Sequence, residues 1–202
     1  SGTSVPEFIA AGTISLTSKQ TVDADTLWRI YSMTKPITGM AVMMLIEEGR
    51  LKLDQPLAEI LPAYANMRVL KSANGAVEDT VPAERPITIR HLLTHTAGLG
   101  YNIVQSGPIK ATYEKYGLVP GQVSRIALPG INQVEPVRGL ANFADRLARV
   151  PLVYQPGSKW SYSVSRDLLG RVIEVASGMS FDELQKKKNT VMDDAESFKS
   201  FN

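Results

Sequence analysis

The sequence contains no cysteine and only two histidines among its 202 residues. It can therefore form no disulfide, no thiolate zinc site and no cysteine-based catalytic site. The two histidines, His91 and His95, have the i, i+4 spacing of some metal ligands, but Leu-Leu-Thr lies between them instead of the H-E-x-x-H zinc frame. We therefore expect His95 to make structural hydrogen bonds at the end of a helix.

Long apolar runs and strong net charge are also missing. No stretch is long and apolar enough to span a membrane, and the first residues lack a signal-peptide pattern, although a signal could precede this numbering. The formal net charge is +2. The basic run Lys186–Lys188 is expected to be solvated surface and not a nucleic-acid site. These absences favour a soluble protein with no nucleic-acid partner, and its compartment stays open.

The hydrophobic content of 44% is enough for a core in one domain or two small ones. Its pattern predicts a strand at 7–17, a second short strand or a buried lead-in at 26–32, and a helix over Met33–Glu48 that is apolar on nearly every face and hence buried. An Asn-Gly turn suggests a small hairpin in 72–84. Further helices are expected from Ile87 with Thr88 as its cap, over 140–152, over 167–177, and from the Ser180/Glu183 capping pair. Residues 101–139 read as a long loop, of the kind that often forms a lid or a binding wall.

Together these elements predict an α+β fold, with an antiparallel sheet flanked by helices and a mostly helical inserted region. The expected division is 1–50 as an α/β part with the helix that follows Ser32, 51–170 as the helical region, and 171–202 as an incomplete return to the α/β part. Because two strands cannot form a stable sheet by themselves, we expect the chain to be part of a larger protein.

Ser32 and Lys35 form a Ser-x-x-Lys pattern at the start of the first long helix. A serine hydroxyl is a weak nucleophile until a neighbouring base takes its proton, and a lysine can be that base where burial disfavours the ammonium form. The alternative is that Ser32 caps the helix and Lys35 lies on the surface. The chain has no G-x-S-x-G elbow, so a Ser–His–Asp triad is not indicated.

Tyr162 follows a Pro-Gly turn and lies between two serines. A tyrosine hydroxyl beside a lysine ammonium ionises more readily and can then act as a general base and acid. A buried tyrosine with a satisfied hydroxyl is the common alternative.

The order S-M-T-K, L-L-T-H-T-A-G-L, P-G-S-K-W-S-Y-S and D-L-L-G-R-V-I-E-V-A-S-G resembles the serine β-lactamase-like superfamily over about Thr26–Leu184. That superfamily includes class C β-lactamases, penicillin-binding proteins, D-amino-acid peptidases and family VIII carboxylesterases. The resemblance implies that Ser32 is the acylated nucleophile, that Lys35 activates it and that Tyr162 passes the proton to the leaving group. It also implies half of an oxyanion hole at the Ser32 N–H, and an acyl pocket walled by Trp160 and the loop 101–139.

Two departures from the family pattern refine this expectation. Val164 stands where lactamases have an asparagine that holds the substrate amide, and valine offers no such hydrogen bond; we still count Val164 as a substrate-binding position. No Lys-Thr-Gly-like third motif follows Ser180, which again suggests a partial sequence. The pattern Y-S-x-x-x-D-x-L-G is similar to family VIII carboxylesterases.

The resemblance therefore implies a bacterial carboxylesterase, cytoplasmic or periplasmic, that cleaves short-chain esters through a Ser acyl-enzyme without a metal or other cofactor. A β-lactamase, a D-amino-acid peptidase, an acyltransferase or a non-catalytic binding protein on the same scaffold are the alternatives. The substrate would be a small ester, and the oligomeric state stays open.

Overall fold

The computed structural model describes residues 8–28, 30–120 and 135–184. The chain divides into two compact units, Ser1–Thr34 and Lys35–Asn202. The basic run Lys186–Lys188 and much of the expected loop 101–139 lie outside the described residues. The expected division at residues 50 and 170 stays a prediction.

The described residues of the first unit form one isolated β-bridge in place of the expected strands. Thr13 and Thr21 form an isolated antiparallel bridge, flanked by hydrogen bonds from the Ile14 N–H to the Gln20 oxygen and from the Val22 N–H to the Gly12 oxygen, both 3.1 Å. The prediction of strands at 7–17 and 26–32 is wrong for the described residues, since Tyr31–Met33 forms the 3-10 helix η1. β-branched residues favour a strand only where a neighbouring strand completes the ladder, and no such strand lies beside these residues in the described part of this unit.

Helix α1 spans Thr34–Glu47, within one residue of the prediction at each end. Pro36 lies in its first turn, where no intrahelical N–H bond is lost. Gly49 follows in the left-handed region with φ 71°, as expected for a residue that ends a helix. The expectation that α1 is buried all round is wrong: its buried face is Thr38, Ala41, Val42 and Leu45, whereas Met40 and Met43 are 45% and 51% exposed.

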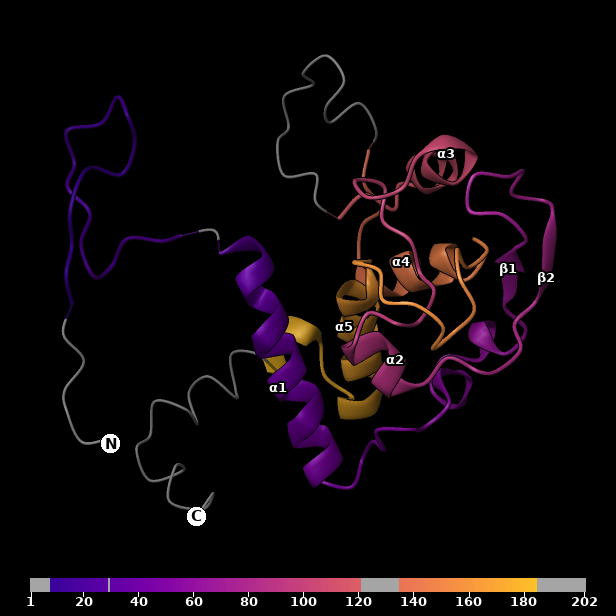
Figure 1. Cartoon of the computed structure of the whole chain (residues 1–202). Helices are drawn as coiled ribbons and strands as arrows, with labels where there is room; N and C mark the ends of the chain where they lie inside the picture. The colour runs from indigo at the N-terminus through magenta and orange to yellow at the C-terminus, as the bar shows by residue number, and fades with distance from the viewer. Residues whose placement is uncertain (1–7, 29, 121–134, 185–202) are drawn as a thin grey trace. The chain divides into compact units, whose positions relative to one another are not determined.

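The second unit continues with short elements and a small sheet. Its elements after α1 are the 3-10 helices η2 (Leu57–Glu59) and η3 (Pro62–Tyr64), the strands β1 (Arg68–Leu70) and β2 (Thr80–Pro82), and the helices α2 (Ile89–Leu93), α3 (Gly107–Lys115), α4 (Leu140–Leu147) and α5 (Ser165–Ser177). β1 and β2 pair antiparallel, with Val69 opposite Val81. The predicted hairpin is thus present but begins earlier than 72, because β1 buries Val69 and Leu70. The α+β class is confirmed (Figure 1).

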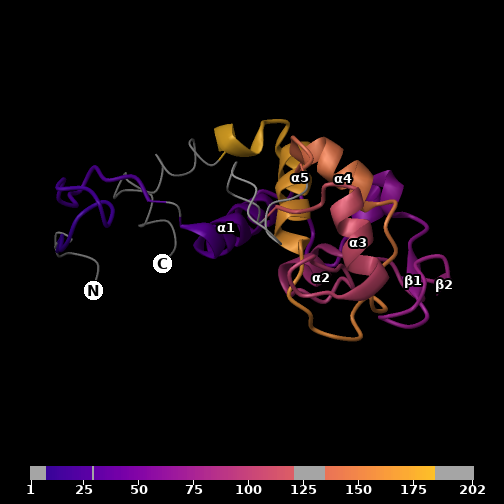
Figure 2. The same ribbon diagram turned by 90° about the horizontal axis from the view of Figure 1, so that it is seen from above.

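The core of this unit is built around α5, which contacts both α2 and α4, and Figure 2 shows α4 beside α5. Leu168, Leu169, Val172 and Ile173 of α5 are fully buried, the spacing of one apolar helix face. Gly170 permits the close approach of α4, since a Cβ there would lie 2.9 Å from a methyl carbon of Leu140. Gly178, with φ 71°, ends α5 where the sequence predicted.

Two of the remaining predicted segments, the loop over 101–139 and the helix over 140–152, need correction, and the capping pair at Ser180 is confirmed. The loop prediction for 101–139 missed α3, which buries only Ile109 and Tyr113 and so carries too short an apolar pattern to detect. The helix expected over 140–152 ends at Leu147. The capping pair near 180 is confirmed, with the Ser180 hydroxyl donating to Glu183 at 2.6 Å. No helix in the described ranges is long and apolar enough to cross a membrane.

Candidate active site

Ser32 lies on η1, directly before α1, and is exposed. The Thr34 N–H donates to the Tyr31 carbonyl, which closes this short turn, and also to the Ser32 carbonyl. Tyr31, immediately before it, has φ 46°, a left-handed conformation that costs a non-glycine residue about 1 kcal/mol and is frequent at functional sites. Lys35 follows three residues later in the first turn of α1, in the second unit.

Lys35 and Tyr162 come together in the second unit although 127 residues separate them in the sequence. The Lys35 Nζ lies 4.9 Å from the centre of the Tyr162 ring, within the range of a cation–π contact. Lys35 is half-buried, and so is Tyr162. Two of the three expected catalytic side chains are therefore neighbours in the fold.

Two aromatic rings contact Tyr162, and a third contacts one of these two. The His95 imidazole stacks on the Tyr162 ring with centroids 5.2 Å apart, and the Tyr101 ring is tilted against it at 5.9 Å. The Trp160 ring meets His95 edge-on at 6.4 Å and is itself 63% exposed. Trp160 thus lies next to this cluster with an open face, and its expected role as a pocket wall stays a prediction.

Val164 occupies a different environment from Trp160. Its side chain is fully buried, it is the N-cap residue of α5, and its N–H donates to the Gly100 oxygen at 3.2 Å. Val164 therefore connects the start of α5 through the backbone to the residue that directly follows the L-L-T-H-T-A-G-L segment. Its expected contact with substrate stays a prediction.

The cluster shifts the protonation of two groups in opposite directions. Burial, followed by the charges of Arg166 and Lys35, lowers the pKa of His95 to about 4. Burial raises the pKa of Asp167 to about 6, against the opposing effects of its own backbone N–H and of Lys35. Burial, and then Asp167 and Tyr162, also raise the pKa of Tyr101. At neutral pH the site thus holds a neutral imidazole and a buried carboxylate.

The raised pKa of Asp167 predicts a specific pH dependence of stability. A carboxyl whose folded pKa is about 6 destabilises the fold when ionised, and this cost disappears as the pH falls from 6 towards the unfolded value near 3.8. Asp167→Asn should therefore raise the free energy of unfolding at pH 7.5 by about 1–3 kcal/mol, and the gain should shrink by pH 4.5.

Denaturant unfolding at the two pH values measures this gain. Asp54→Asn is the control, because Asp54 is exposed and its hydrogen bond with Arg90 lowers its pKa. That variant should show no stabilisation at pH 7.5. An equal gain in the free energy of unfolding of Asp167→Asn at both pH values would contradict the raised pKa of Asp167.

Sequence reasoning missed Tyr101, Arg166 and Asp167. The Arg166 Nη2 donates to the Leu93 oxygen at 2.7 Å, while its buried Nε and Nη1 have no hydrogen-bond partner. Nη1 would lie 3.0 Å from a Cβ at position 39, so Gly39 of α1 is needed for this approach. Tyr101 and Arg166 carried no sequence signal beyond their positions, close after the L-L-T-H-T-A-G-L segment and at the start of an amphipathic helix. Asp167 stood in the Y-S-x-x-x-D-x-L-G pattern, but no role was assigned to it.

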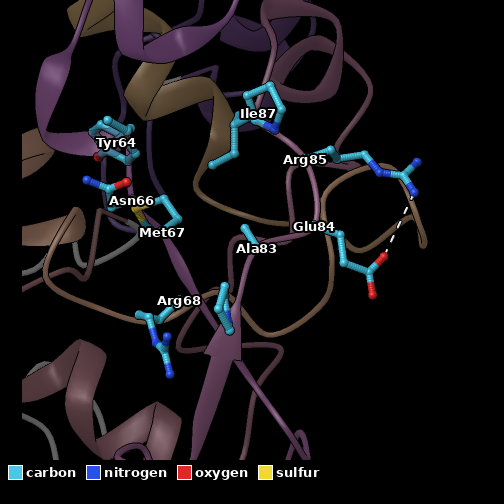
Figure 3. A pocket seen from close by; sticks show the side chains of 11 residues that line it. Tyr64, Asn66, Met67, Arg68, Ala83, Glu84, Arg85 and Ile87 are labelled. Carbon is cyan, nitrogen blue, oxygen red and sulfur yellow. Dashed lines mark ion pairs between the residues drawn. The ribbon is translucent and has the colours of Figure 1, made fainter.

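A groove of about 470 Å³ lies elsewhere in the second unit, along the hairpin side of η3 (Figure 3). None of its lining residues, Tyr64–Arg68 and Pro82–Ile87, belongs to the cluster around Tyr162. Its charged groups have partners: Arg85 faces Glu84 at 4.0 Å, and Arg68 donates to Thr80. Within the described ranges no group of three or more His, Asp or Glu side chains could hold a metal ion.

The contact of Lys35 with Tyr162 is the part of the expected site that the second unit shows, and the catalytic roles of Ser32, Lys35 and Tyr162 stay predictions. The family model for beta-lactamases matches residues 7–191. The chain therefore belongs to the Beta-lactamase family, and the resemblance to the serine β-lactamase-like superfamily is confirmed.

Individual relatives point to the same family. The chain is 40% identical over 149 residues to Protein Rv1367c of Mycobacterium tuberculosis and 38% identical over 154 residues to Esterase EstB of Burkholderia gladioli. These alignments cover 74% and 76% of the chain but 33% of each relative. The chain thus spans about a third of the length of these curated relatives.

A solved structure is similar as well. EstCE1, described as a hydrolase with promiscuous acyltransferase activity, matches with a TM-score of 0.62 and 31% identity. The match covers 84% of this chain and 38% of EstCE1. This likeness supports a β-lactamase-like fold.

Proposed function

We propose that this chain carries the nucleophile and the general base of a serine carboxylesterase that acts on short-chain esters. The observation that carries the proposal is the contact of Lys35 with Tyr162 at 4.9 Å, with Ser32 three residues before Lys35 in the sequence. The esterase among the relatives and the hydrolase among the structures support ester substrates.

The proposed reaction has two halves. The Ser32 Oγ attacks the ester carbonyl carbon while the Lys35–Tyr162 pair takes its proton, and the alcohol leaves with a proton from Tyr162. Water then attacks the acyl carbon and gives a proton to the same pair, and the pair returns a proton to the Ser32 Oγ as the bond between that oxygen and the acyl carbon breaks, which releases the carboxylic acid and restores Ser32. The positive charge beside the Tyr162 ring favours the phenolate form that accepts these protons.

Val164, at the position where lactamases have an asparagine, favours esters over β-lactams, because it has no hydrogen-bonding group for a substrate amide. We expect the protein that carries this chain to turn over p-nitrophenyl butyrate at least about 100-fold faster, by kcat/KM, than a chromogenic cephalosporin, roughly 3 kcal/mol in transition-state binding. Comparable values for the two substrates would instead favour a β-lactamase.

Acyl transfer is the second candidate, and the description of EstCE1 favours it. An alcohol can replace water in the second half of the reaction. Product analysis with added methanol separates the two: methyl butyrate formed at the expense of butyrate indicates transfer, and butyrate alone indicates hydrolysis.

A further inference from the structure

His95 is connected to the residues on both sides of Tyr162. Its carbonyl accepts from the Ser161 N–H at 3.0 Å. Its Nδ1 accepts from the Ser163 N–H at 3.3 Å and lies 3.1 Å from the Ser163 hydroxyl. Since Ser161 and Ser163 flank Tyr162, these contacts fix the backbone that carries its phenol.

The side chain of His95 also contacts Tyr162 directly. The centroids of the two rings lie 5.2 Å apart with an interplanar angle of 26°, a stacked contact. The contact of His95 with Trp160 is edge-on. Tyr162 in turn lies against the Lys35 ammonium. His95 therefore contacts Tyr162 through its ring and the neighbouring Ser161 through its backbone, and Tyr162 contacts Lys35.

The conformation of His95 is unusual for its residue type. Its φ is 56°, and it shares the left-handed region with only one other non-glycine residue of the described chain, Tyr31. Such a conformation persists where surrounding contacts impose it. Here those contacts are the hydrogen bonds of His95 with Ser161 and Ser163. His95 makes them from the turn that directly follows α2.

The protonation state of His95 fits a residue that orients its neighbours better than one that transfers protons. Because the Ser163 N–H donates to Nδ1, the neutral ring holds its proton on Nε2. Burial and the cations Arg166 and Lys35 keep the pKa near 4, so the ring stays neutral at the pH of ester hydrolysis.

We propose that His95 is a positioning residue that holds the Tyr162 phenol against Lys35. This inference deepens the proposed function and rests on it for its kinetic test. It assigns to the L-L-T-H-T-A-G-L segment a defined task, which is to orient the tyrosine without exchanging protons with the substrate.

Two substitutions separate the contacts of His95. His95→Asn keeps an acceptor near the Nδ1 position and tolerates the left-handed backbone. His95→Phe keeps a ring to stack but removes the acceptor. We expect kcat to fall about 100-fold in His95→Phe, with KM within about twofold, and a partial recovery in His95→Asn, about 10-fold below the wild type.

The matched control is the other histidine of the chain, which lies four residues before His95. His91 lies on α2 and accepts from the Thr88 N–H in a capping box, and glutamine is a usual residue for that position. His91→Gln should leave kcat within about twofold of the wild type. If the loss of any histidine near α2 had a general effect, kcat would fall alike in His95→Phe and His91→Gln.

A double-mutant cycle distinguishes positioning from a purely structural role. If His95 acts through Tyr162, His95→Phe should have little further effect on kcat in a Tyr162→Phe background. Independent, multiplicative losses in the cycle would overturn the proposal, as would a His95→Phe enzyme with an unchanged kcat.

A measurement without turnover keeps this test separate from the proposed function. Nitration by tetranitromethane, mapped by peptide mass, reports how accessible Tyr162 is. We expect Tyr162 to be nitrated several-fold faster in His95→Phe and at the wild-type rate in His91→Gln. Faster nitration with no esterase activity in the wild type would contradict the esterase but support the positioning, whereas unchanged nitration would contradict the positioning.

Discussion

Replacing Ser32 with alanine should lower kcat for p-nitrophenyl butyrate by about 1,000-fold or more, because no other group in the proposed reaction forms the acyl-enzyme. The exposed position of Ser32 on a short 3-10 turn means that loss of one oxygen should not disturb packing. The thermal midpoint should therefore stay within a few degrees of the wild type.

The control for this substitution is Ser72→Ala, at an exposed serine in the hairpin connection. Its rate should match the wild type. A Ser32→Ala enzyme that keeps a tenth of the wild-type rate or more would exclude Ser32 as the nucleophile. In that case the Ser-x-x-Lys pattern would be a helix start with a surface lysine, the alternative weighed from the sequence.

Replacing Lys35 with methionine should lower kcat by about 100- to 10,000-fold, the range expected for loss of a general base or of the charge that activates it. Methionine keeps the length and the helix propensity of lysine but removes the charge that lies 4.9 Å from the Tyr162 ring. Tyr162 would then lack the nearby cation that favours its phenolate.

A matched control sharpens this prediction. Lys52→Met, at an exposed lysine after α1, should behave as the wild type. A Lys35→Met enzyme within tenfold of the wild type would show that Lys35 is not part of the catalytic machinery.

Local signals in the sequence predicted the helices well. Thr88 caps α2 through the bond that its hydroxyl accepts from the His91 N–H, and Gly178 ends α5 in the left-handed region. Both depend on contacts within a few residues, which a sequence pattern contains in full. By contrast, the strand predicted at 7–17 depends on a partner that the sequence pattern does not specify.

The candidate site was predictable only in part, for a similar reason. Lys35 and Tyr162 were expected from motifs, and their contact agrees with that expectation. Tyr101 and Arg166 carry no motif of their own. Asp167 stands in the Y-S-x-x-x-D-x-L-G pattern, but the burial that shifts its pKa arises from tertiary packing. His95 was expected to make structural hydrogen bonds, and it does so with Ser163; its stacking on Tyr162 required the fold.

The central claim is that an acyl group is transferred to Ser32, and mass spectrometry of the protein quenched during p-nitrophenyl butyrate turnover tests it most directly. The account predicts a single butyryl adduct on the intact protein, mapped to the peptide that contains Ser32 and absent from Ser32→Ala. An adduct on another residue, or turnover with an adduct that persists in Ser32→Ala, would contradict it.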